Sequence, residues 1–194
     1  MGRMTSEPLP LVRCAHPAQA LIVGLLLCLS FAAVGIAPGV VTLVWLAMVT
    51  PSLVIIDLRL RRLPNVLVVP GLAAAFVDGC WATVSSGEFP VAALLTTSTV
   101  AVVMLVLNLV GGLGMGDVKL SVVMAGCLSL VSPLLAVLAL MLAFFVGGGY
   151  SAALLLRRRE PRGRRMAFGP LLLVAFWAVV ALRALSSIGV VSVS

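Results

Sequence analysis

Long apolar runs alternate with short polar breaks along the whole chain. Runs of about 17 or more apolar residues are long enough to cross a membrane as helices. The pattern predicts seven spans, of which the fifth is short: 18–37, 40–56, 66–84, 91–110, 118–131, 134–156 and 167–189. The expected fold class is all-α, a polytopic membrane helical bundle of about seven transmembrane helices. Residues 1–17 are expected to form a cytoplasmic tail and residues 18–190 a single transmembrane domain.

The basic residues lie mainly between the spans. Of all residues 62% are apolar and 10% are charged, and the net charge is +7. With the N-terminus inside, seven spans place every basic residue except Arg183 on the cytoplasmic side, as the positive-inside rule requires. A charge distributed in this way indicates contact with membrane lipids and argues against nucleic-acid binding, for which no interleaved aromatic and basic residues are present.

The four cysteines are scattered, at positions 14, 28, 80 and 127, and none belongs to a C-x-x-C pair. This spacing is typical of small apolar residues in a membrane rather than of a zinc site or a disulfide framework. We therefore expect neither a metal nor a cofactor.

A glycine-rich break separates the fourth and fifth spans and ends at Asp117. A carboxylate at the end of a membrane helix is costly, so it is a candidate functional residue. Gly114 and Gly116 precede it. They leave the backbone free to adopt positive φ, and they let an extended peptide approach without obstruction by side chains. Lys119 follows within the same helical turn.

Asp57 occupies a comparable position at the end of the second span. The predicted topology places Asp57 and Asp117 on different helices, both at the cytoplasmic face and at similar depth. If the second and fifth spans are neighbours, the two carboxylates come within a few ångströms and hold one proton between them. One carboxyl group can then activate water while the other protonates a substrate carbonyl, as in aspartic proteases.

Two other interpretations of these aspartates stay open. Taken singly, an aspartate at a helix terminus is most often a cap or a solvated boundary residue. A small transporter or channel could also use the pair to carry protons or cations. Transport favours carboxylates near the middle of the membrane and helices that are broken there, whereas Asp57 and Asp117 are predicted at the rim.

Three segments resemble the type IV prepilin leader peptidases, which are membrane aspartic proteases of the GxGD type. They are Asp57-Leu58-Arg59 followed by Leu63-Pro64-Asn65, then Gly114-Met115-Gly116-Asp117 with Lys119-Leu120, and finally Ala167-Phe168-Gly169-Pro170. The segments occur in the family's order and extend from about residue 50 to the end of the chain. A presenilin-like protease is a weaker match, because such proteins usually have a tyrosine beside the first aspartate, where this chain has Ile56 and Leu58.

The resemblance implies an endopeptidase of the bacterial inner membrane that serves type IV pili or protein secretion. It would cut the basic leader of prepilin or pseudopilin precursors at the cytoplasmic face. Asp57 and Asp117 would be catalytic, with Gly114, Gly116 and Lys119 supporting the loop. Larger members have an N-terminal segment with paired cysteines that is associated with N-methylation. Without such pairs this chain resembles a short, peptidase-only member, with one helix, the first, added to a six-helix core.

One further pair of charges lies away from this face. Asp78 is in the outer half of the third span and Arg183 in the outer half of the last. They either form a buried ion pair or lie separately near the membrane interface. Asn108, near the end of the fourth span, is expected to form a hydrogen bond across helices.

Overall fold

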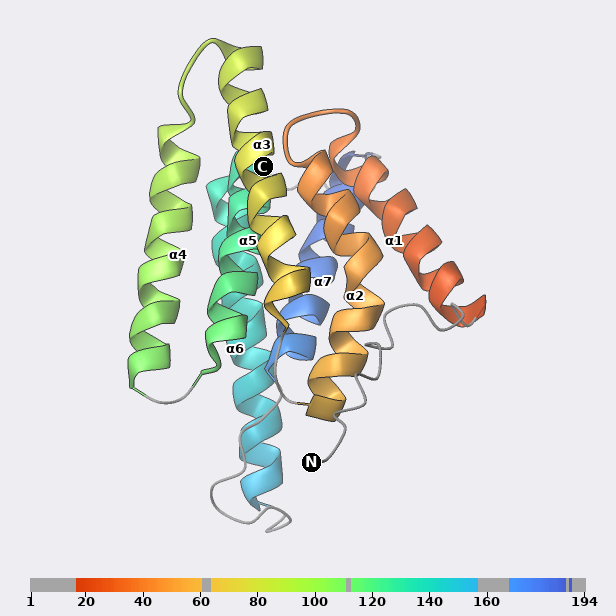
Figure 1. Cartoon of the computed structure of the whole chain (residues 1–194), viewed down its shortest axis with the longest axis vertical. Coiled ribbons are helices and arrows are strands. Elements are labelled where there is room, and N and C mark those ends of the chain that lie inside the picture. Colours follow the sequence, from red (N-terminus) through yellow and green to blue (C-terminus); the bar gives the residue numbers. More distant parts are fainter. Residues whose placement is uncertain (1–16, 61–63, 111–112, 157–167, 188, 190–194) are drawn as a thin grey trace, which may run out of the picture.

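Seven helices run up and down through the bundle in this computed structural model, which describes residues 17–60, 64–110, 113–156, 168–187 and 189 (Figure 1). The helices are α1 (Pro17–Val34), α2 (Val40–Leu60), α3 (Asn65–Ser86), α4 (Val91–Leu109), α5 (Met115–Val131), α6 (Pro133–Leu156) and α7 (Gly169–Ser187). All regular structure in the described ranges is helical, which confirms the all-α fold class. The N-terminal tail, Gly111 and Gly112, and the arginine-rich block at 157–165 lie outside the described residues.

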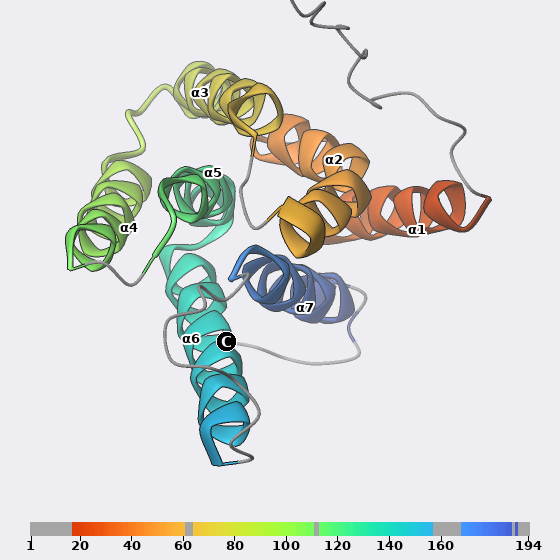
Figure 2. The ribbon, with the colours of Figure 1, turned by 60° about the horizontal axis from the view of Figure 1, so that its bottom comes forward.

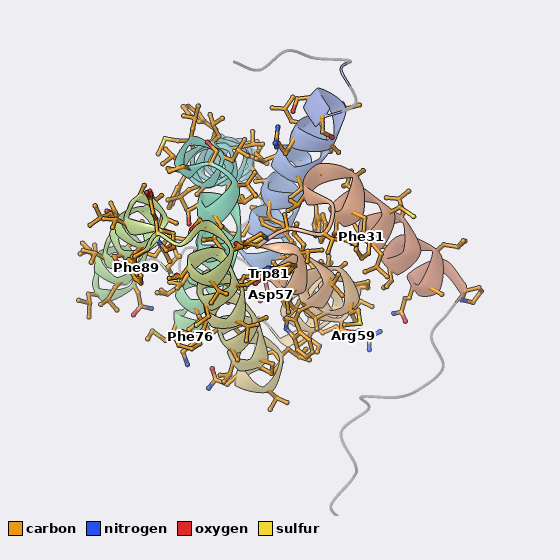
Figure 3. All side chains as sticks on the ribbon, turned by 90° about the horizontal axis from the view of Figure 1, so that it is seen from above. Phe31, Asp57, Arg59, Phe76, Trp81 and Phe89 are labelled. Carbon is orange, nitrogen blue, oxygen red and sulfur yellow. The ribbon has the colours of Figure 1, made fainter. Side chains whose placement is uncertain are left out.

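The outer surface of the bundle is apolar, as a membrane requires. Six of the helices, all except α5, are long and apolar enough to cross a membrane. Large apolar side chains cover the outside: Phe31, Phe76 and Phe89 are 49%, 74% and 60% exposed and lie at the periphery in Figure 3. Such a continuous apolar surface is unfavourable in water and favourable in lipid. The chain is therefore a helical membrane bundle.

The shortest helix, α5, is the central one. Ten of its 17 residues are buried, compared with three each in α3 and α4. It packs against α3, α4 and α6, and also contacts α2 and α7, so that all the other helices except α1 are arranged around it (Figure 2). Gly71 of α3 allows this close packing, because a Cβ atom there would lie 3.2 Å from Cγ1 of Val123 in α5. The position of α5 brings its N-terminal residues close to both α2 and α7.

At the end of the bundle away from Asp57 and Asp117, Asp78 caps α2. Its side chain is fully buried and accepts hydrogen bonds from the backbone N–H groups of Val41 and Thr42, at 3.3 and 2.8 Å, and from the Thr42 hydroxyl at 2.6 Å. The N-terminus of a helix favours a negative charge. The ion pair with Arg183 is therefore wrong: the Arg183 Nη1 contacts the Ser186 hydroxyl, at 3.5 Å, and the side chain is exposed.

Replacing Asp78 by alanine should destabilise the fold without changing the contacts of Asp57 and Asp117, which lie at the other end of the bundle. Asp78→Ala leaves the N–H groups of Val41 and Thr42 and the buried Thr42 hydroxyl without an acceptor, and we expect a loss of about 3 kcal/mol of unfolding free energy. Asp78→Asn keeps one acceptor oxygen and should lose less. Thermal unfolding in detergent micelles measures the effect. Equal melting temperatures for Asp78→Ala and for Glu88→Ala, which alters an exposed side chain, would contradict the capping role.

Candidate active site

Asp57 lies in the last turn of α2 and faces the interior of the bundle. Its side chain is only 4% exposed, whereas the next residue, Leu58, is 62% exposed and Arg59 is also exposed. In Figure 3, which looks along the bundle, Asp57 lies near the centre of the projection, inside the ring of outward-facing side chains. The helix continues past the end of the apolar run, so the position of Asp57 is fixed by helical backbone rather than by a loop.

Asp117 lies in the first turn of α5 and is 8% exposed. Gly114 is the N-cap of this helix, with φ −77° and ψ 144°, and its carbonyl accepts a hydrogen bond of 3.0 Å from the Asp117 N–H. Any residue can adopt this backbone conformation, so Gly114 does not use the freedom to adopt positive φ that was expected of it. A Cβ atom at Gly114 would, however, lie 3.3 Å from Asp117 Oδ2. The glycine is exposed and leaves that edge of the carboxylate accessible. Gly116 is half-buried within the same helical turn.

The two carboxylates converge on a third residue, Gly169, at the first position of α7. A Cβ atom placed on Gly169 would lie 2.7 Å from Asp57 Oδ2 and 3.4 Å from Asp117 Oδ1. Those two oxygens are therefore no more than about 6 Å apart, the sum of the two distances. Only glycine leaves this space free, because real Cβ atoms do not approach other atoms to 2.7 Å. Gly169 thus lies directly beside both aspartates.

Both facing oxygens lack a hydrogen-bond partner. Asp57 Oδ2 and Asp117 Oδ1 are buried, and neither has a donor within the described part of the chain. The remaining interactions come from backbone amides, that of Gly169 toward Asp57 and that of Gly114 toward Asp117. Unpaired buried oxygens are costly and rare in folded proteins. Two such oxygens this close together are satisfied by a shared proton, or by a polar molecule with hydrogens to donate, such as water.

Two hydrogen bonds outside the pair fix the helix ends that carry it. The ammonium group of Lys119 donates to Asn65 Oδ1 at 2.9 Å and so joins the start of α5 to the start of α3. Asn108, in the last turn of α4, donates to the carbonyl of Leu113 at 2.8 Å and holds the residue before the Gly114 cap. Lys119 therefore helps to hold the start of α5 in place through its hydrogen bond to Asn65, which follows Leu63-Pro64 in the first motif.

The location of the pair bears on the transporter interpretation. Asp57 is three residues from the end of α2 and Asp117 is two residues from the start of α5. Neither lies near the middle of a helix, where a membrane transporter is expected to place its carboxylates.

Within the described ranges, no group of three or more His, Cys, Asp or Glu residues is placed to hold a metal ion.

A family model described as the type IV leader peptidase family matches residues 40–152, more than half of the chain. The chain belongs to the type IV leader peptidase family. This confirms the resemblance drawn from the sequence motifs. The leader peptidase match includes Asp57 and Asp117, and it leaves α1 and α7 outside. No curated protein and no solved structure matches the chain.

Sequence motifs alone did not identify Gly169 as a site residue of this leader peptidase family member. Phe168-Gly169-Pro170 was a recognisable motif, but its contact with the aspartates depends on how α7 packs. The residue is 112 positions from Asp57 and 52 from Asp117 in the sequence. The local signal was a glycine directly before a proline at the start of an apolar run, an arrangement that also occurs at ordinary helix starts.

Proposed function

We propose that this chain is an aspartic endopeptidase that removes the basic leader from prepilin-like precursors. The observation that supports this most directly is the convergence of two unpaired carboxylate oxygens, from α2 and α5, on the space above Gly169. Membership of the type IV leader peptidase family supplies the substrate class. Asp57 and Asp117 are the catalytic residues, and Gly114, Gly116, Lys119 and Gly169 support or shape the site.

In the proposed reaction, a water molecule lies between the two carboxylates, which share one proton. The ionised aspartate takes a proton from the water, and the water oxygen attacks the carbonyl carbon of the scissile peptide bond. The protonated aspartate gives its proton to the carbonyl oxygen, forming a neutral tetrahedral diol. Collapse of the diol breaks the C–N bond: the departing amine receives the proton taken from the water, while one diol hydroxyl gives its proton to the other aspartate, which restores the shared proton of the pair. The products are a leader with a new carboxyl terminus and a mature chain with a new amino terminus.

The substrate would present its scissile bond at the rim of the membrane. The positive-inside distribution of arginines favours the cytoplasmic side for the end of the bundle that carries Asp57 and Asp117, and family membership favours a bacterial inner membrane. A basic leader lies on that side as well, while the mature apolar helix stays in the lipid. The exposed edge at Gly114 gives an extended segment access to Asp117. N-methylation of the product is not part of this proposal.

Cleavage of a purified precursor tests the function. The enzyme in proteoliposomes is incubated with a pilin-like precursor from the same genome, which has a basic leader before an apolar helix, and the products are weighed by mass spectrometry in H₂¹⁸O. We expect two fragments whose masses add up to precursor plus one water, with ¹⁸O in the leader's new carboxyl group. The same precursor without its leader should stay intact. Absence of cleavage of every such precursor from that genome would overturn the proposal.

A further inference from the structure

The residue before Gly169 is held by α6. Phe168 is half-buried, and its ring lies 5.5 Å from the ring of Phe144, at an angle of 38°. On the same side of α6, Gly147 is buried against the Phe168 ring: a Cβ atom there would lie 2.9 Å from Phe168 Cε2 and 3.4 Å from Cδ2. The Phe168 carbonyl also accepts the 3.1 Å hydrogen bond from Leu172 that begins α7. Phe168 is thus fixed by its ring on one side and by its backbone on the other.

We propose that Phe144 and Gly147 of α6 form a socket for Phe168 that positions Gly169 against the two aspartates. This inference rests on the proposed function. The socket residues touch neither carboxylate, so they are positioning residues rather than catalytic ones. Their effect passes through a single peptide bond, because Gly169 follows Phe168 directly. A shift of the Phe168 ring by a few tenths of an ångström moves the start of α7. Gly169 has no room to move toward Asp57 there, because even a Cβ atom on it would lie only 2.7 Å from Asp57 Oδ2.

Of the three consecutive glycines of α6, Gly147, Gly148 and Gly149, only the first belongs to this socket. Glycine is less favourable than alanine within a helix, so each one calls for a reason. At Gly147 the reason is contact with Phe168. A Cβ atom at Gly148 or at Gly149 would meet no atom within 4 Å. Only the first of the three glycines therefore faces the segment that leads to the site, and the next one provides a control with the same chemical change.

The test compares Gly147→Ala with Gly148→Ala in the precursor-cleavage assay. The added methyl at 147 must displace the Phe168 ring, and a misplacement of this kind near a catalytic pair lowers kcat by at least about tenfold. KM should change less than twofold, since the socket touches no part of the expected substrate path. Gly148→Ala should retain kcat within about twofold, because helix propensity improves and no contact is made. Equal kcat values for the two variants, with wild-type cleavage intact, would overturn the socket and leave the proposed function standing.

A second variant distinguishes a socket from a general packing defect. In Gly147→Ala/Phe168→Leu, the shorter side chain removes the Cε2 atom that the new methyl meets. The double variant should recover at least about a third of the lost activity, a non-additive effect expected only for residues in direct contact. A double variant no more active than Gly147→Ala alone would refute the inference. If Gly147→Ala does not accumulate in the membrane, Phe168→Ala probes the same contact, and full activity of that variant would also refute it.

Discussion

Asp57→Asn and Asp117→Asn are each expected to lower leader cleavage by at least about a thousandfold. Asparagine keeps the shape of the side chain but can neither take a proton from water nor give one to a carbonyl oxygen. The two carboxylates work as one unit around a shared proton, so the loss of either should equal the loss of both. The measurement is kcat/KM of the purified variants, and the double variant should be no less active than the single ones.

Insertion and folding must be followed alongside activity, because both aspartates are buried. Replacing a buried carboxylate by a neutral amide removes a desolvated charge, and we expect the variants to keep near wild-type melting temperatures. Glu88→Gln is the matched control: it makes the same carboxylate-to-amide change at an exposed turn. If either aspartate variant cleaves the precursor at more than a tenth of the wild-type rate, the two-aspartate mechanism is wrong. The chain would remain a family member whose chemistry lies elsewhere.

The number and order of the helices could be predicted from the sequence because each apolar run must find a hydrogen-bonded conformation in lipid. The ends of the helices that carry the aspartates were less accurate. The second span was expected to end at residue 56 and the fifth to begin at 118, whereas α2 continues to Leu60 and α5 begins at Met115. Hydropathy shows where the chain leaves the apolar part of the membrane, whereas a helix ends at its last backbone hydrogen bond, which can lie several residues further on. Both aspartates therefore lie inside helices, which fixes the direction of each side chain.

The sequence could predict that Asp57 and Asp117 lie at the same end of the bundle, but not which groups they contact. Positive-inside counting assigns Asp57 and Asp117 to one face, while their convergence on Gly169 follows from the packing of α2, α5 and α7. Asp78 illustrates the same limit. A buried ion pair with Arg183 was one of two alternatives for Asp78, but its partners are two backbone N–H groups and a hydroxyl of α2. Every non-proline residue has a backbone donor, so no sequence pattern distinguishes the ones that are used.

Gly169→Ala is expected to lower kcat by about a hundredfold, although it removes no functional group. The new Cβ would be 2.7 Å from Asp57 Oδ2 and 3.3 Å from the Asp57 Cγ, so either the carboxylate or the start of α7 must shift. The methyl would also occupy the space that the two unpaired oxygens face, where the proposed water binds. A displacement of about 1 Å at a reacting group is enough for an effect of this size. The measurement is kcat of the purified variant in the precursor-cleavage assay.

Gly79→Ala separates this steric effect from the general effect of adding a methyl to a helix. Gly79 lies in α3, and a Cβ atom there would meet nothing within 4 Å, so this variant should cleave at the wild-type rate. Gly169→Ser adds the same Cβ atom and a hydroxyl, and it should be at least as inactive as Gly169→Ala because the hydroxyl cannot relieve the contact with Asp57. If Gly169→Ala keeps more than half of the wild-type kcat, the space above Gly169 does not hold the reacting water. The pair would then have to act from its other edge, at Gly114, where Asp117 Oδ2 meets the exposed start of α5.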